Sequence, residues 1–139
     1  MSEFFELKEF LRSDTAREQK IENLPDWETI EHLNELALFL DGLRDAWAGP
    51  INVTSGFRCP KLNVVVGGAN RSAHTEGYAA DLVPKRDDME GFKKKVVEWI
   101  KDKDFDQCIL ERSGKSEWVH IGLYGPDKVQ RHEILKLNV

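Results

Sequence analysis

Two histidines and one aspartate are the residues of this sequence whose types best suit metal chemistry. His74 and Asp81 stand in the segment 72–81, and His120 ends the distant segment 117–120. Imidazole nitrogens and carboxylate oxygens are common zinc ligands. Three protein ligands leave the fourth coordination position open, which is typical of a catalytic rather than a structural zinc site. The sequence therefore predicts one catalytic Zn²⁺ ion per chain, held by these three residues.

Each of these residues also has a structural interpretation. His120 would lie within a strand between Val119 and Ile121, where a histidine is often only a hydrogen-bonded core residue. The same holds for His74 taken alone. Asp81 is harder to explain in this way, because burying a carboxylate among apolar neighbours is costly unless it is paired or binds a metal. Asp81 therefore favours the metal interpretation.

A hydrolytic site also needs a general base, and Glu117 is the first candidate because it precedes His120 by three residues. Such a carboxylate takes a proton during the attack and passes it to the leaving group. In a regular strand, positions 117 and 120 face opposite ways, so Glu117 is expected at a loop end or bulge after Gly114–Ser116. The alternative is a solvated surface charge. Glu76 and Glu111 are reserve candidates.

Arg58 is the candidate for binding negative charge. It follows Ser55–Phe57 at the exit of a predicted strand. A guanidinium stays charged at neutral pH and offers a fork of donors to a carboxylate or a tetrahedral oxyanion. The alternative for an isolated arginine is an ordinary surface side chain.

Helices that would position these residues are predicted where apolar side chains recur every three or four positions. The clearest pattern follows Asp26, a good N-cap, and stops at Gly49–Pro50. A capping box, Asp87 with Glu90, is expected to begin a later helix. Short helical or turn segments are predicted around residues 4–11 and over 59–70, with irregular structure between 12 and 25.

Strands are predicted where apolar and polar residues alternate between turn signals. Helices come first and strands cluster later, which favours an α+β fold with a mainly antiparallel sheet and helices packed against it. The length suits one compact domain over residues 1–139. The strands are expected at Ile51–Thr54, Tyr78–Val83, Phe105–Leu110, Trp118–Leu123 and His132–Val139.

Composition disfavours several functions. The net charge is −5, and acidic residues interrupt the densest basic stretch, Lys85–Lys95, so nucleic-acid binding is not expected. No apolar run is long enough to cross a bilayer, and the acidic residues 1–6 do not resemble a secretory signal. A protein that is cytoplasmic as made, without a membrane partner, is expected. Cys59 and Cys108 are expected to be buried free thiols.

Three separated motifs resemble a known family. Ser72-x-His74-x-x-Gly77-x-Ala79-x-Asp81 together with Glu117-x-x-His120 is similar to the zinc D-Ala-D-Ala carboxypeptidases of the Hedgehog/DD-peptidase family. The upstream segments 54–58 and 66–69 resemble the small single-domain branch of phage and bacterial cell-wall peptidases. The match runs from about residue 23 to residue 131, which is most of the chain.

The resemblance implies a role for each matching residue. Glu117 would be the general base and acid, and Arg58 would stabilise the oxyanion or anchor the substrate. Ser72 and Trp118 would shape the substrate pocket. The zinc ligands would be His74, Asp81 and His120, and a supporting shell around them would contain Gln107 and Glu111.

The implied activity is hydrolysis of a peptide bond in peptidoglycan stem peptides, as a D,D-carboxypeptidase or an L-alanyl-D-glutamate endopeptidase. The implied partner is the cell wall, reached after release of a monomeric enzyme, as for a compact phage endolysin. A non-catalytic binding module that keeps its metal for stability is the alternative, against which Glu117 and Arg58 argue. Non-haem iron oxygenases also use two histidines and a carboxylate, but with a closer spacing and on an all-β barrel.

Overall fold

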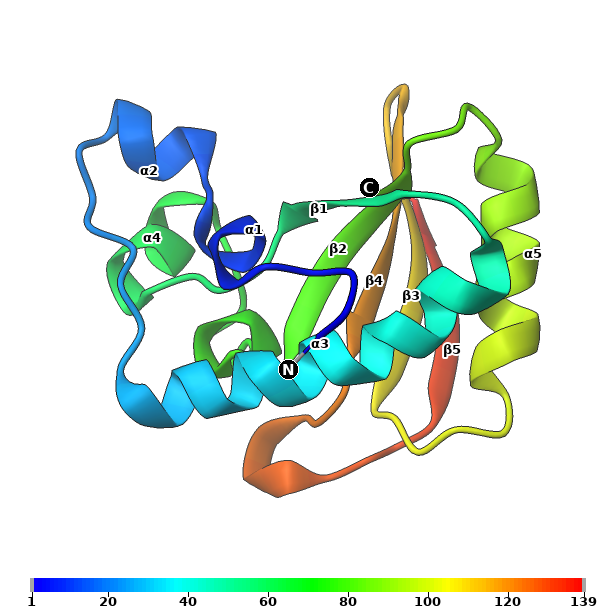
Figure 1. Ribbon diagram of the computed structural model, residues 1–139. Coiled ribbons are helices and arrows are strands. Elements are labelled where there is room, and N and C mark those ends of the chain that lie inside the picture. Colours follow the sequence, from blue (N-terminus) through cyan, green and yellow to red (C-terminus); the bar gives the residue numbers. More distant parts are fainter. Residues whose placement is uncertain (1, 139) are drawn as a thin grey trace.

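A five-stranded sheet forms the centre of the protein in the computed structural model, which describes residues 2–138 (Figure 1). The strand order is β1-β2-β4-β3-β5. The pairs β1–β2, β2–β4 and β4–β3 are antiparallel, and only β3–β5 is parallel. The strands are β1 (Ile51–Ser55), β2 (Ala79–Pro84), β3 (Gln107–Ser113), β4 (Ser116–Gly122) and β5 (Glu133–Asn138).

Helices cover one face of this sheet (Figure 1). Helix α5 packs on β2, β3 and β4, and α3 packs against α5. The α+β class and the mainly antiparallel sheet are thus as predicted. The helices are α1 (Leu7–Leu11), α2 (Asp14–Glu18), α3 (Trp27–Trp47), α4 (Pro60–Val65) and α5 (Met89–Ile100), with the 3₁₀ turns η1 (Ala73–Glu76) and η2 (Pro126–Lys128).

Alternation along each strand divides the sheet into a core face and an open face. On β4, Val119 and Ile121 are fully buried against the helices, whereas Trp118 and His120, which alternate with them, are half-buried. Burial of the apolar set stabilises the fold, since each large aliphatic side chain contributes about 1.5–3 kcal/mol. The opposite face carries the polar metal-cleft side chains together with apolar residues such as Ile109 and Leu135.

The start of α3 agrees with the prediction, whereas the start of α5 differs by one residue. Helix α3 begins after Asp26, whose carboxylate accepts the N–H of Thr29 at 2.8 Å, as predicted. The N-cap of α5 is Asp88, not Asp87, because the Asp88 carboxylate accepts the N–H of Gly91 at 2.9 Å. A Cβ at Gly91 would lie 2.2 Å from that carboxylate, so the glycine leaves room for the cap.

The N-terminal region is more regular than predicted and holds the segment that carries Arg58. Helix α2 forms where irregular structure was expected, because Ser13 caps it. The Phe57 N–H donates to the carbonyl of Phe10 at 2.7 Å. The side-chain amide of Asn23 donates to the Phe57 carbonyl at 2.9 Å, and its oxygen accepts the Cys59 N–H at 2.8 Å. These bonds tie the exit of β1 to α1 and to the segment before α3.

The burial of the two cysteines is as predicted. Cys59 and Cys108 are both buried and free. None of the helices between residues 2 and 138 combines the length and the apolar content needed to cross a membrane. The last strand runs to Asn138, and Val139, which was included in the predicted strand, lies outside the described residues.

Candidate metal centre

The fold brings His74, Asp81 and His120 together on the open face of the sheet. Their ligand atoms all lie within 4.8 Å of one another. Asp81 on β2 and His120 on β4 are direct partners in the antiparallel pair, and His74 comes from η1 just before β2. Asp81 Oδ1 lies 3.0 Å from His120 Nδ1 and 3.4 Å from His74 Nε2.

Backbone groups orient the His74 ring. Its Nδ1 lies 2.7 Å from the carbonyl oxygen of Gly56. A carbonyl can only accept, so Nδ1 carries the proton and Nε2 keeps its lone pair for the centre of the site. The Ser72 hydroxyl caps η1 by accepting the His74 N–H at 3.2 Å. Gly77, with φ 79°, then ends the turn so that the chain can enter β2.

Asp81 supplies a fixed negative charge. Burial alone would raise the pKa of its carboxyl group, but the adjacent imidazoles of His120 and His74 outweigh burial and hold the pKa well below the usual value. The carboxylate is therefore ionised at neutral pH, between two imidazole rings whose centroids lie 5.1 Å apart.

These three groups fit a zinc ion. Ligand atoms placed 2.0–2.2 Å from zinc at tetrahedral angles lie about 3.4 Å from one another. The observed separations, from 3.0 Å up to 4.8 Å, bracket this value. Two neutral imidazoles and one carboxylate also form a donor set that zinc prefers, with one coordination position left over. The donor chemistry and the geometry therefore agree.

Glu117 lies on the other face of the sheet. The β3–β4 register runs without a bulge from Ser113↔Ser116 to Arg112↔Glu117 and onward. The Glu117 carboxylate accepts a hydrogen bond from Arg112 at 3.0 Å and contacts the Lys93 ammonium of α5. The expected loop end or bulge is therefore wrong, because the tight hairpin already places residue 117 in regular strand. The role of Glu117 as general base stays a prediction that this arrangement does not favour.

The two cations also change the acidity of Glu117. Hydrogen bonds from Lys93 and Arg112 lower the pKa of its carboxyl group. A carboxylate with a lowered pKa is a weaker base. Both its position and its partners thus separate Glu117 from the chemistry at His120.

Glu111 is the carboxylate that lies on the same face as the metal ligands. It is paired across the strands with Trp118 and stands two residues from Ile109, the partner of His120. Trp118 Nε1 donates a hydrogen bond to Glu111 Oε2 at 2.7 Å. Glu111 and Trp118 line the same cleft as the three ligands, a hollow of about 470 Å³.

Arg58 lines this cleft, with part of its guanidinium left unpaired by the described residues. Its Nη2 donates to the Ser72 hydroxyl at 3.2 Å. Its Nε is buried and has no hydrogen-bond partner among residues 2–138. Burial lowers the pKa of the guanidinium, and the nearby carboxylates of Asp81 and Glu111 oppose this effect. A buried donor without a partner favours a ligand that brings an acceptor oxygen.

Asp106 and Arg131 complete the cleft, and the sequence analysis missed both. The buried Asp106 carboxylate accepts two hydrogen bonds from the Arg131 guanidinium, each at 2.8 Å, and one from its backbone N–H at 3.0 Å. This pair anchors the segment between β4 and β5 beside the metal ligands. The overlooked signal is the position of Asp106 next to Phe105 in a predicted strand, where a buried carboxylate needs a partner as Asp81 does. Gln107 lines the cleft too, but its amide donates to Glu133 rather than to a ligand.

The cleft continues on the other side of the metal ligands. A second hollow, of about 310 Å³, shares Arg58 and Asp81 with the first. It lies over β1, whereas the first hollow lies over β4 and β3, so Asp81 on β2 stands between the two. Side chains of the second hollow come from the segment between α1 and α2, from β1 and from α4, and include Arg12, Ser13, Asp14, Thr54, Ser55 and Leu62.

Comparison with known proteins places the chain in a family. The sequence profile of the family described as Peptidase M15 matches residues 3–122, which include the three candidate ligands. A search of curated protein sequences gave no match. Because the matched region covers most of the chain, the protein belongs to the peptidase M15 family, whose members are in general zinc-dependent peptidases.

Proposed function

We propose that this member of the peptidase M15 family is a zinc peptidase that hydrolyses a peptide bond in the stem peptides of peptidoglycan. The observation that carries the proposal is the convergence of His74, Asp81 and His120 in one cleft with the half-buried Arg58. We also infer a Hedgehog/DD-peptidase type of fold over one domain, residues 1–139. The enzyme would be a monomer, made in the cytoplasm, that meets the wall after release.

The three ligands would hold the zinc ion. When bound, the ion would polarise the scissile carbonyl and lower the pKa of its water toward about 7. The Gly56 carbonyl would keep His74 in the tautomer that binds through Nε2. The carboxylate of Asp81 would reduce the net charge of the site, which suits the uncharged amide that is cleaved.

Glu111 replaces Glu117 in this proposal as the general base and acid. It lies on the metal face, in the same cleft as the ligands. The hydrogen bond from Trp118 fixes one carboxylate oxygen, Oε2, and leaves the other for the proton of the attacking water. Glu111 would then deliver this proton to the leaving amine. Trp118 would act as the group that orients the base, beyond its predicted role in shaping the pocket.

Arg58 would bind the oxygen that becomes negative during the reaction, or a carboxylate of the substrate. Its buried Nε lacks a partner among the described residues, and its Nη2 is already oriented by Ser72. A preorganised donor in a buried site stabilises developing charge without reorganisation, an effect worth about 3–4 kcal/mol where it has been removed by mutation. Ser72 would thus position Arg58 as well as η1.

The shape of the cleft favours an endopeptidase over a carboxypeptidase. A carboxypeptidase needs room for only one residue and its free carboxylate beyond the scissile bond. Here hollows of about 470 Å³ and 310 Å³ lie on the two sides of Asp81 and Arg58. A peptide could therefore extend across the metal ligands in both directions.

Digestion of purified cell wall with mass spectrometry of the fragments tests the function. We expect internal cleavage of stem peptides, loss of activity with a chelator and recovery with zinc. Release of free alanine alone would replace the endopeptidase with a carboxypeptidase. No cleavage of several wall types by protein shown to contain one zinc ion would favour the binding module, and bound iron with oxygen-dependent turnover would overturn the peptidase.

A further inference from the structure

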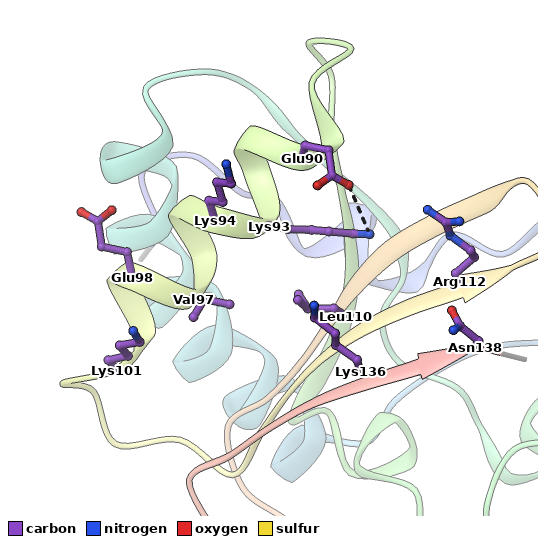
Figure 2. Close-up of a pocket in the computed structure, with 10 residues that line it drawn as sticks. All are labelled: Glu90, Lys93, Lys94, Val97, Glu98, Lys101, Leu110, Arg112, Lys136 and Asn138. Carbon is purple, nitrogen blue, oxygen red and sulfur yellow. Dashed lines mark ion pairs between the residues drawn. The ribbon is translucent and has the colours of Figure 1, made fainter.

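A groove of about 750 Å³ lies on the sheet face opposite to the metal cleft, between α5 and the strands β3 and β5 (Figure 2). Leu110 and Arg112 of β3 line this groove, whereas Ile109 and Glu111 line the metal cleft. Successive side chains of a strand point to opposite faces, so the two hollows are separated by the sheet. The proposed peptidase chemistry uses none of the groove.

Cations dominate the lining of the groove. Five cationic side chains line it with two carboxylates, and a third carboxylate, Glu117, contacts two of the cations, so the balance is +2, although the whole chain carries a net charge of −5. Such a concentration of one sign of charge attracts ligands of the opposite sign. The cations are Lys93, Lys94, Lys101, Arg112 and Lys136, and the carboxylates are Glu90 and Glu98.

One carboxylate beside the groove organises two of these cations. Glu117 contacts the Lys93 ammonium and accepts a hydrogen bond from Arg112 at 3.0 Å. Glu90 lies farther from Lys93, at 4.0 Å. Figure 2 marks this ion pair with a dashed line. A single carboxylate shared by two cations fixes their positions but leaves a positive charge. Glu117 is thus a positioning residue of the groove.

The remaining cations are spread along the groove. Among residues 2–138, no carboxylate forms an ion pair with Lys94, Lys101 or Lys136. Lys94 and Lys101 are seven residues apart on α5, which is about 10.5 Å along a helix axis. Lys136 lies across the groove on β5 (Figure 2). Charges placed at intervals suit an extended polyanion better than one isolated phosphate.

The floor of the groove indicates what kind of polyanion fits. The uncharged lining residues are Val97, Leu110 and Asn138, and no aromatic side chain lines the groove. Proteins that bind single-stranded nucleic acids usually stack the bases on aromatic side chains. Two aliphatic residues and an amide suit a small polyol instead, and the arginine fork with the lysines suits phosphate.

We propose that this groove binds a linear poly(polyol phosphate), a phosphodiester polymer without bases, of the kind carried by bacterial walls. The choice of a wall polymer rests on the proposed function, whereas the phosphodiester chemistry rests on the groove alone. Binding there would hold the enzyme at the wall while the cleft on the opposite face remains open to stem peptides.

Binding of poly(glycerol phosphate) to the full-length protein tests this inference. Titration calorimetry measures the binding to the zinc-loaded and to the chelator-treated protein. We expect binding in both forms that weakens as salt rises, because counterions are released from the polymer. A Lys101→Glu, Lys136→Glu variant should bind at least about tenfold more weakly. Absence of binding by the unmodified protein at low salt would overturn the proposal.

The matched control is a Lys61→Glu, Lys85→Glu variant, which alters two exposed lysines outside the groove and changes the net charge equally. We expect its affinity for poly(glycerol phosphate) to stay within about twofold of that of the unmodified protein. An equal loss of affinity in both variants would mean non-specific attraction and would refute the groove as the binding site. Single-stranded DNA of equal phosphate number should compete poorly, and stronger binding of DNA would replace the polymer with a nucleic acid. Cleavage of a soluble stem peptide should be the same in all three proteins, so a failed peptidase and a failed groove give different results.

Discussion

Separate substitution of Glu111 and Glu117 by glutamine tests which of the two is the general base. Glu111 lies in the metal cleft and Glu117 lies behind the sheet, although only Glu117 has the spacing from His120 that the sequence motif suggests. We expect Glu111→Gln to abolish most activity and Glu117→Gln to preserve it. Glutamine has the size of glutamate and can still accept the hydrogen bond from Trp118 Nε1, so the first substitution removes the base without emptying the site.

The size of the effect follows from the role. A positioned general base contributes about 10²- to 10⁴-fold to the rate. At 1.36 kcal/mol per tenfold, the expected loss for Glu111→Gln is about 3–5 kcal/mol of transition-state stabilisation. Glu117→Gln removes the ionic partner of Lys93 and Arg112 on a partly exposed surface, which should leave the free energy of unfolding little changed and kcat within about twofold.

The assay is kcat and KM on a soluble stem peptide, with the zinc content of each variant measured by atomic absorption. A loss of kcat with full zinc occupancy identifies the base, whereas a loss of zinc would identify a ligand. The reasoning is refuted if Glu117→Gln, with zinc bound, loses more than about a hundredfold while Glu111→Gln retains most of its activity. Trp118→Phe should fall between the two, since it frees the Glu111 carboxylate without removing it.

Four further predictions follow from the other contacts. Asp106→Asn should lower the free energy of unfolding in urea by about 1–3 kcal/mol, because Arg131 loses its buried ionic partner. Burial would raise the pKa of Asp106, but the hydrogen bonds from Arg131 outweigh it and lower the pKa. This stabilisation is therefore present above the unfolded pKa of about 3.9 and is lost as the pH falls through the lower folded pKa. The difference in unfolding free energy between the two proteins should shrink at acidic pH, and a constant difference would contradict the ion pair. Burial raises the pKa of Cys108 to about 12, so its thiol should resist a thiol reagent at pH 8 until urea unfolds the chain. Arg58→Ala should lower kcat by about 10²- to 10³-fold while zinc stays bound, and an effect on KM alone would make Arg58 a substrate anchor. His74→Ala should reduce the zinc content below one ion per chain, and an unchanged content would remove His74 from the ligand set.

Local patterns determined a large part of this protein. The apolar spacing after Asp26 predicted α3, and the alternation in the later half predicted the strands, because both depend on periodicities that any buried face must obey. The three ligands were predicted from residue type and burial cost: Asp81 among apolar neighbours needed a partner. The start of α5 was missed by one residue, because Asp87 and Asp88 can both cap a helix and only the close approach to Gly91 decides between them.

The identity of the base depended on the tertiary structure. Sequence spacing placed Glu117 beside His120, but the hairpin between β3 and β4 sets the register, and the register decides which face each residue occupies. Lys93, from a helix packed on the far face, then holds Glu117 there. The same assembly of distant elements joins Asp106 to Arg131 and lines the basic groove with residues from α5, β3 and β5. Residue types and their periodicity thus indicate which chemistry the chain carries, whereas the partners of each charge come from segments far apart in sequence and are decided only by packing.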